Sequence, residues 1–146
     1  MNYLEMVLPG SDGLDHQLKD YHGKKVVLYF YPKDNTSGCT LEAKEFTRLK
    51  NEYETLGYTI IGVSKDSVKS HQNFIKKQEL DLLLLSDENL QLITAFDVYK
   101  EKSMYGKKYM GVERSTFLLD ESGKVSASFR SVNASKHPET LLCELK

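Results

Sequence analysis

The 146 residues are predicted to form an α/β fold with a mixed central sheet flanked by helices. Short runs of β-branched and aromatic residues alternate with segments whose apolar residues recur every three or four positions, which is typical of strands alternating with helices. The last third of the chain instead contains two strand-like segments joined by a short turn, which predicts an antiparallel hairpin. Because no linker, repeat or low-complexity tract interrupts this order, we expect one domain over residues 1–146.

The first elements are a small hairpin and a central strand. Asp12-Gly13 is a turn dipeptide between two mildly apolar pieces and predicts an N-terminal β-hairpin. Residues 26–31 are continuously apolar or aromatic, as in a strand that is buried on both faces. Pro32 has no backbone N–H and therefore ends this strand.

The remaining elements follow in order along the chain. An amphipathic helix runs from Thr40 to the stop signal at Gly57, and a later helix is capped by Asp66 or Ser67. A C-terminal helix opens with Ser135 and Pro138. Between these helices we expect a buried strand, a short strand, a short helix and a strand hairpin, at 58–64, 82–87, 90–96 and 114–130. The order βαβ followed by ββα is that of a thioredoxin-like fold.

Composition excludes several classes of function. A net charge of -1 provides no basic field, so neither nucleic acid nor a membrane surface is an expected partner. The start of the sequence lacks the basic and apolar regions of a secretory signal, so a cytoplasmic protein is expected. The four histidines show no metal-ligand spacing and are expected on the surface, without a metal. Four lysines before Arg114 are interpreted as a solvated basic loop, at positions 100, 102, 107 and 108.

The chemistry is expected at Cys39. The chain has only Cys39 and Cys143, which is too few for a disulfide scaffold, and they form no CxxC motif. Cys39 lies in the first turn of the helix after the central strand, where free N–H groups and the helix dipole favour a thiolate, so we expect partial exposure rather than a buried, inert thiol. Ionising the thiol by lowering its pKa accelerates its reaction only a little, because the nucleophilicity of a thiolate falls as its pKa falls. A catalytic Cys39 therefore needs positioned donors, which directs attention to Thr36 and to an arginine.

The segment YFYPKDNTSGCTLEAKEF resembles the peroxiredoxins, and together with ERSTFLLDESGKV it is similar to their bacterioferritin comigratory, or Q-type, branch. The resemblance covers most of the chain and implies that Cys39 is a peroxidatic cysteine. It further implies that Thr36 hydrogen-bonds the thiolate and the peroxide, that Pro32 shields the thiolate, and that Arg114 keeps it ionised and polarises the O–O bond. Glu42 could orient Arg114 or complement the helix dipole, and we favour the second role.

Two positions depart from the family pattern. Ser37 stands where proline is usual, and it could cap the helix instead. Lys44 stands where many members of this branch have a resolving cysteine, so their intramolecular disulfide cannot form. The cycle then uses one cysteine with an external thiol, or it uses Cys143 of another subunit. Cys143 is expected to point away from the apolar face of its helix.

The function implied by the resemblance is an antioxidant thiol-dependent peroxidase that reduces hydrogen peroxide and organic hydroperoxides. Its reductant would be thioredoxin, glutaredoxin or a small thiol, it would be a monomer or weak dimer, and it would need no cofactor. Thioredoxin-like thiol–disulfide exchange is disfavoured because Glu42 occupies the position of the second cysteine. A redox sensor or chaperone-like module, with a slowly oxidised Cys39, is the alternative of a different class.

Overall fold

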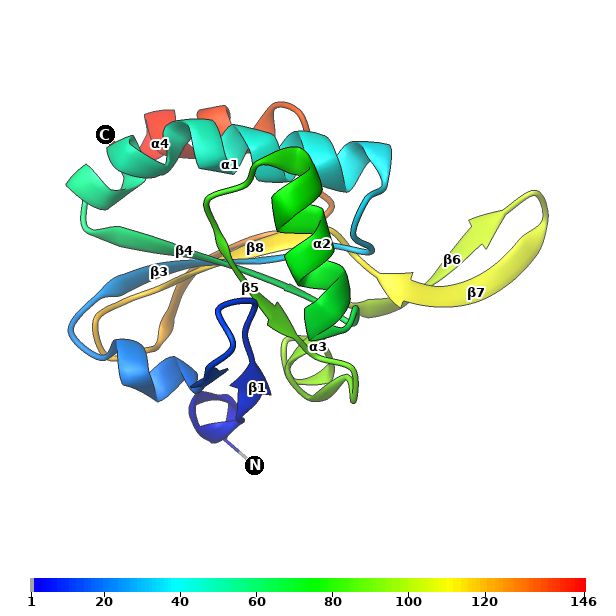
Figure 1. Cartoon of the computed structure of the whole chain (residues 1–146), viewed down its shortest axis with the longest axis horizontal. Helices are drawn as coiled ribbons and strands as arrows, with labels where there is room; N and C mark the ends of the chain where they lie inside the picture. The colour runs from blue at the N-terminus through cyan, green and yellow to red at the C-terminus, as the bar shows by residue number, and fades with distance from the viewer. Residues whose placement is uncertain (1) are drawn as a thin grey trace.

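A five-stranded mixed sheet forms the centre of the computed structural model, which describes residues 2–146 (Figure 1). The strand order is β5-β4-β3-β8-β9. The first three are parallel to one another, whereas β8 is antiparallel to both β3 and β9. The strands are β3 (Lys25–Phe30), β4 (Tyr58–Ser64), β5 (Leu83–Ser86), β8 (Ser115–Leu119) and β9 (Val125–Phe129). The predicted thioredoxin-like fold with a mixed central sheet is confirmed.

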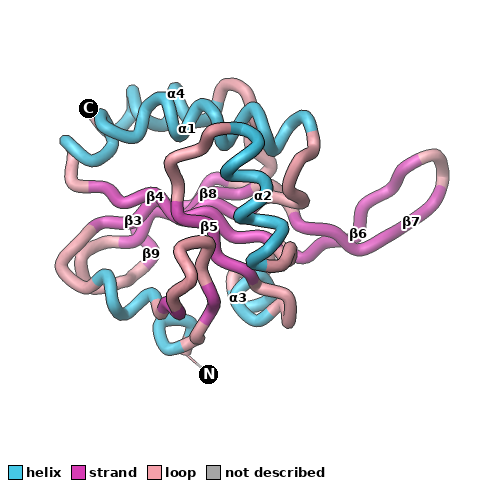
Figure 2. The backbone as a smooth tube through the Cα atoms, in the orientation of Figure 1, coloured by secondary structure: helices cyan, strands magenta, loops and turns pink. Residues whose placement is uncertain are grey.

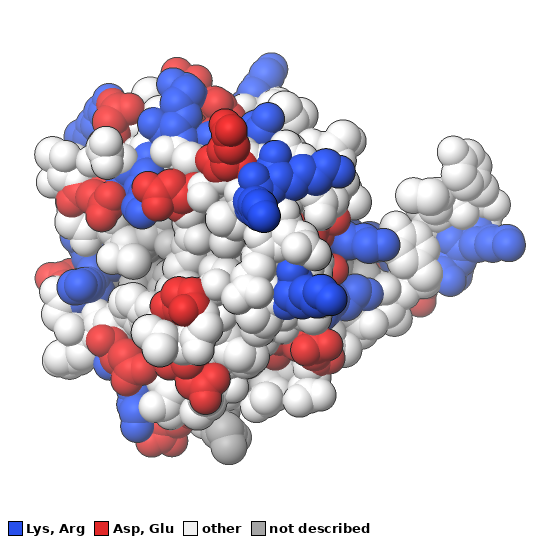
Figure 3. Space-filling view, in the orientation of Figure 1, with Lys and Arg blue, Asp and Glu red and all other residues white. Residues whose placement is uncertain are grey.

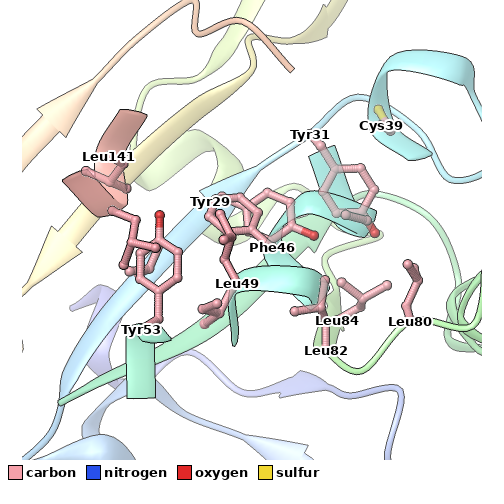
Figure 4. Close-up of a cluster of buried hydrophobic side chains, with 14 of the residues drawn as sticks. Tyr29, Tyr31, Cys39, Phe46, Leu49, Tyr53, Leu80, Leu82, Leu84 and Leu141 are labelled. Atoms are coloured by element: carbon pink, nitrogen blue, oxygen red, sulfur yellow. The ribbon is translucent and has the colours of Figure 1, made fainter. Parts of the chain in front are cut away.

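Helices cover both faces of the sheet because successive residues of the central strands point to opposite sides. One core lies under α1 (Ser37–Thr55), α2 (Val68–Gln78) and α4 (His137–Leu145). The other core is covered by α3 (Gln91–Ala95) and by the N-terminal segment. Figure 4 shows the first core, in which the tilted rings of Tyr29 and Phe46 pack together with their centroids 4.6 Å apart.

The N-terminal segment contains the predicted hairpin, which is confirmed. Its strands are β1 (Leu8–Pro9) and β2 (Asp15–His16), and Gly13 has the positive φ that its turn requires. Two short 3₁₀ helices accompany it, η1 (Tyr3–Glu5) and η2 (Leu18–Tyr21).

The helix termini resolve three sequence expectations. The helix predicted from Thr40 begins three residues earlier, at Ser37, and Gly57 follows its C-cap with a φ of 89°. Ser67 rather than Asp66 caps α2, because its side chain accepts a hydrogen bond from the Ser70 N–H. Ser135 does not cap α4: its hydroxyl instead donates to Asn133, which organises the preceding turn.

The lysine-rich segment is largely exposed, as predicted, but it is not a loop, so that part of the prediction is wrong. Residues 99–112 form a two-stranded antiparallel ribbon of β6 (Tyr99–Met104) and β7 (Lys107–Val112). The ribbon projects from the body and is joined to it only at its base (Figures 1 and 2). Because only the base of the ribbon, at Tyr99 and Val112, packs against a core, its strands lack the alternating apolar pattern by which strands are recognised.

Two histidines contradict the expectation of surface positions. His71 is completely buried, and His137 is nearly so. Each is satisfied by groups from distant segments: His71 lies between Asp34 and a backbone carbonyl, and the Nε2 atom of His137 bonds the Thr116 hydroxyl. Burial lowers the pKa of His137 to about 4. Spacing along the sequence does not reveal such partners.

None of the helices within residues 2–146 is both long and apolar enough to cross a membrane.

Gly62 lies in β4, and a substitution there tests how tightly side chains from β3 and β5 pack over it. A Cβ atom at this position would lie 2.7 Å from Leu84 Cδ2 and 2.8 Å from Tyr29 Cζ. We expect Gly62→Ala to lower the free energy of unfolding by about 1–3 kcal/mol, because neither neighbour can move in a filled core. Urea unfolding measures this change. Ser128→Ala on the exposed face of β9 is the control and should stay within about 0.5 kcal/mol of wild type, and an equally stable Gly62→Ala would contradict the packing.

Candidate active site

The pairing of β3 with β8 brings Cys39 and Arg114, which are far apart in the sequence, close to each other. Cys39 lies in the first turn of α1, which follows β3 after a six-residue loop at 31–36. Phe30 at the end of β3 pairs with Ser115 at the start of β8. Arg114 immediately precedes Ser115, so the antiparallel pairing places its side chain beside the start of α1.

Arg114 connects the thiol to a buried acid. Its Nη2 atom donates to Cys39 Sγ at 3.3 Å, and its Nη1 atom donates to Glu42 Oε1 at 2.8 Å. The planar guanidinium presents both N–H groups at once in a fixed geometry, which a lysine cannot do. A positive charge is therefore held against the sulfur.

Cys39 is more deeply placed than the sequence suggested. Its side chain is only 1% exposed, so the expected partial exposure is wrong. The side chain turns inward and joins the core that contains Tyr29, Tyr31 and Ala43, while Arg114 lies against its sulfur. Figure 4 shows Cys39 at the edge of this core, beyond Tyr31.

Gly38 provides room for the guanidinium. A Cβ atom at this position would lie 3.1 Å from Arg114 Nη2, which is tighter than an ordinary contact. A side chain here would displace the group that contacts Cys39. The glycine before the cysteine is thus explained by close approach rather than by an unusual backbone angle.

Glu42 orients Arg114, which is the role that the sequence analysis favoured less. Its side chain is fully buried, and its Oε1 atom forms the ion pair with Arg114. The other oxygen, Oε2, has no hydrogen-bond partner among residues 2–146, and neither has the nearby Tyr29 hydroxyl. Burial raises the pKa of Glu42 to about 7, and the Arg114 charge limits this rise.

Thr36 and Pro32 shape the loop before the helix. The Thr36 hydroxyl donates to the Lys33 carbonyl at 2.8 Å, and its own carbonyl accepts the N–H of Thr40 in the first helical turn. Thr36 is therefore the N-cap residue, the role considered for Ser37, although its side chain does not cap the helix. Pro32 directly follows β3 and is half-buried.

A buried polar network that the sequence analysis missed fixes this loop. Asp34 accepts a hydrogen bond from the Tyr31 hydroxyl at 2.6 Å and faces His71 Nδ1 at 2.7 Å. The other ring nitrogen of His71 donates to the Leu85 carbonyl at 2.9 Å, which anchors the network to β5. Because Asp34 lies two residues before Thr36, the network sets the position from which α1 begins.

Asp34, Asp66 and His71 also lie close enough to share a metal ion. Their facing atoms are already engaged, however. Asp66 Oδ2 accepts from the Asp34 N–H and from the Ser64 hydroxyl, while Asp34 Oδ2 accepts from the Ser70 hydroxyl. Hydrogen bonds within the protein therefore satisfy the group without a metal.

Comparisons with known proteins agree on one family. The AhpC/TSA family model matches residues 3–128. Peroxiredoxin Bcp of Xanthomonas campestris pv. campestris is 46% identical over 142 residues, which cover 97% of this chain and 89% of that protein. Peroxiredoxin Bcp of Bacillus subtilis is also 46% identical, over 97% of this chain and 90% of that protein.

Solved structures show the same relationship. A structure of Xanthomonas campestris peroxiredoxin Q superposes with a TM-score of 0.92 at 45% identity, covering 98% of this chain and 90% of that one. A cysteine-to-serine mutant of Xylella fastidiosa PrxQ gives a TM-score of 0.94 at 42% identity, over 99% and 91% of the two chains.

The buried carboxyl of Glu42 should make stability depend on pH. Its pKa rises from 4.5 in the unfolded chain to about 7 in the folded one, so the folded protein retains a proton that the unfolded chain has lost. This contribution is fully present below pH 4.5 and is lost as the pH rises through about 7. We expect Glu42→Gln to remove it, a difference of up to about 3 kcal/mol.

Urea unfolding of both proteins between pH 4.5 and 8 measures the effect. His137 produces the opposite slope, because its lowered pKa removes stability as the pH falls from 6.5 toward 4. The difference between wild type and Glu42→Gln cancels the His137 contribution. A difference that does not change with pH would show that Glu42 is not protonated on folding.

Proposed function

The chain belongs to the AhpC/TSA family of peroxiredoxins and is a thiol-dependent peroxidase, and from this premise we propose that Cys39 is its peroxidatic cysteine, acting in a one-cysteine mechanism. The observation that carries the assignment is the contact between Arg114 Nη2 and Cys39 Sγ at 3.3 Å. This contact places a fixed cation at the atom that must act as a nucleophile.

In the proposed reaction the Cys39 thiolate attacks the terminal oxygen of a hydroperoxide. An S–O bond forms while the O–O bond breaks, and the sulfur becomes a sulfenic acid. The leaving oxygen takes up a proton and departs as water or an alcohol. Negative charge moves from the sulfur to the leaving oxygen, so the Arg114 donors bind the transition state more strongly than the ground state.

Thr36 and Pro32 are proposed to position the peroxide and protect the thiolate. Because the Thr36 hydroxyl already donates its proton to the Lys33 carbonyl, it offers lone pairs to an incoming group. It therefore accepts a hydrogen bond from the protonated peroxide oxygen instead of donating one to the thiolate. Pro32 has no N–H group and shields the site from water.

The position of Cys143 supports a mechanism with one cysteine. Lys44 occupies the position of the resolving cysteine, and Cys143 lies on the exposed face of α4. This helix contacts the later part of α1, where Glu139 pairs with Arg48 and Lys146 pairs with Glu52. Arg48 lies nine residues after Cys39, or roughly 13 Å along the helix axis. A disulfide within one chain requires Cα atoms less than about 7 Å apart.

An external thiol then reduces the sulfenic acid. We propose thioredoxin, glutaredoxin or a small thiol as reductant, a monomer or weak dimer, one domain over residues 1–146, and a cytoplasmic location. Because Cys39 is almost completely buried, the first turn of α1 must open before another thiol can reach its sulfur.

Hydrogen peroxide and organic hydroperoxides are the proposed substrates. The Xanthomonas campestris bacterioferritin comigratory protein, a structural relative, has alkyl peroxide reduction activity.

Intact mass after one equivalent of hydrogen peroxide tests the one-cysteine mechanism. Reduced wild type and Cys143→Ser should both gain one oxygen, and added thiol should reverse the gain. Cys39→Ser should gain none and should lose peroxidase turnover by at least about a thousandfold. A disulfide-linked dimer formed by wild type but not by Cys143→Ser would instead make Cys143 the resolving residue. Oxidation at Cys39 without multiple turnovers would favour a redox sensor.

A further inference from the structure

The β6–β7 ribbon exposes an unusual concentration of apolar side chains. Eight large hydrophobic side chains are exposed among residues 2–146, and four of them lie within residues 104–110. These are Met104, Tyr105, Tyr109 and Met110, with exposed fractions of 56%, 98%, 44% and 46%. Single exposed apolar residues need no explanation, but a cluster at the end of a projecting arm indicates a contact surface.

The geometry of the turn at the tip of the ribbon does not explain why a tyrosine is found there. Tyr105 and Gly106 have φ angles of 54° and 78°, so both central residues of the turn are left-handed. Such turns favour asparagine, aspartate or glycine, and a bulky aromatic residue is disfavoured at these angles. Since Tyr105 is also 98% exposed, neither the backbone nor packing within this chain explains an aromatic residue there.

Lysines surround the apolar tip. Residues 99–112 contain four lysines and one glutamate, hence a net charge of +3, although the whole chain has a net charge of -1. The register places Lys102 opposite Tyr109 and Met104 opposite Lys107, so these four side chains share one face of the ribbon. Figure 3 shows basic side chains along the arm, with an uncharged tip beyond them.

We propose that the β6–β7 ribbon docks onto an anionic lipid bilayer, with its apolar tip at the interface and the exposed Lys107 and Lys108 against the headgroups. Tyrosine is enriched at the membrane–water boundary, and lysine side chains place their charge in the headgroup layer while their stems lie along apolar surface. A second copy of the chain fits less well, because pairing two ribbons would bring together two surfaces that each have a charge of +3.

The ribbon is connected directly to the catalytic residues. Val112 ends β7 two residues before Arg114, and Lys102 Nζ donates to the Val112 carbonyl at the base of the arm. The ribbon projects from the end of the molecule at which α1 begins (Figure 1). Docking would therefore hold Cys39 near hydroperoxides carried by lipid chains, a consequence that rests on the proposed peroxidase function.

Vesicle flotation tests the docking independently of peroxidase activity. Peroxide-free vesicles of phosphatidylcholine alone, and of phosphatidylcholine with phosphatidylglycerol, are mixed with reduced protein. We expect binding to the mixed vesicles to be at least about tenfold stronger and to weaken with salt. Lys107→Glu/Lys108→Glu should reduce this binding by at least about tenfold, and Met104→Ser/Tyr105→Ser should reduce it on both kinds of vesicle.

Matched controls separate the ribbon from general surface effects. Lys76→Glu/Lys77→Glu makes the same charge change on the exposed face of α2, and Leu14→Ser removes an exposed apolar side chain from the N-terminal hairpin. Both controls should bind as wild type does. All variants should retain wild-type turnover of hydrogen peroxide, because none of these residues contacts Cys39, Arg114 or Glu42.

Three results would overturn the docking proposal. The first is no binding to anionic vesicles, and the second is an equal loss of binding in the α2 control. The third is a dimer in gel filtration that Met104→Ser/Tyr105→Ser abolishes, which would identify a second copy as the occupant. Failure of wild type to turn over hydrogen peroxide would contradict the proposed function but would leave the vesicle result intact.

Discussion

The contact of one guanidinium with both a sulfur and a buried carboxylate is the interaction on which the rest of the site depends. Arg114 is held by Glu42, and it holds a positive charge against Cys39. A buried ion pair gains little net stability, because each charge loses its hydration, so the arrangement is better explained by chemistry than by folding. The same burial raises the pKa of Glu42.

Several parts of the fold position Arg114 and the start of α1 for this contact. The pairing of β3 with β8 determines where Arg114 lies, and Gly38 leaves room for its guanidinium. The Asp34–His71 contact fixes the loop that leads into α1 from the opposite side. Elements far apart in sequence therefore converge on the first turn of one helix, which brings the catalytic groups together before any substrate arrives.

Local pattern was sufficient for most elements and for the nucleophile. The apolar run at 26–31 and the helical spacing after Thr40 depend on burial of one chain segment, and burial leaves a clear periodic signal. Cys39 was identified by its position at a helix start, whereas Arg114 entered only through the family resemblance. A residue whose role depends on strand pairing across a sheet cannot be recognised from the residues next to it in the sequence.

The features missed by the sequence analysis share a physical cause. His71 finds its partners in the loop after β3 and in β5, and Glu42 is buried because Arg114 crosses to it, so both depend on contacts between distant segments. The β6–β7 ribbon packs against a core only at its base and hence has no apolar alternation. The positive charge of the ribbon was also not evident from the overall composition, because the whole chain has a net charge of -1 whereas residues 99–112 have a net charge of +3.

The most direct test compares two reactions of Cys39 in wild type and Arg114→Lys. Iodoacetamide reports the reactivity of the thiolate alone, whereas hydrogen peroxide also reports support for the breaking O–O bond. Lysine retains the charge but not the paired donors, so the second-order rate with peroxide should fall by about 100-fold and alkylation by less than about tenfold. Equal losses in both reactions would contradict the account, because Arg114 would then serve only to ionise the thiol.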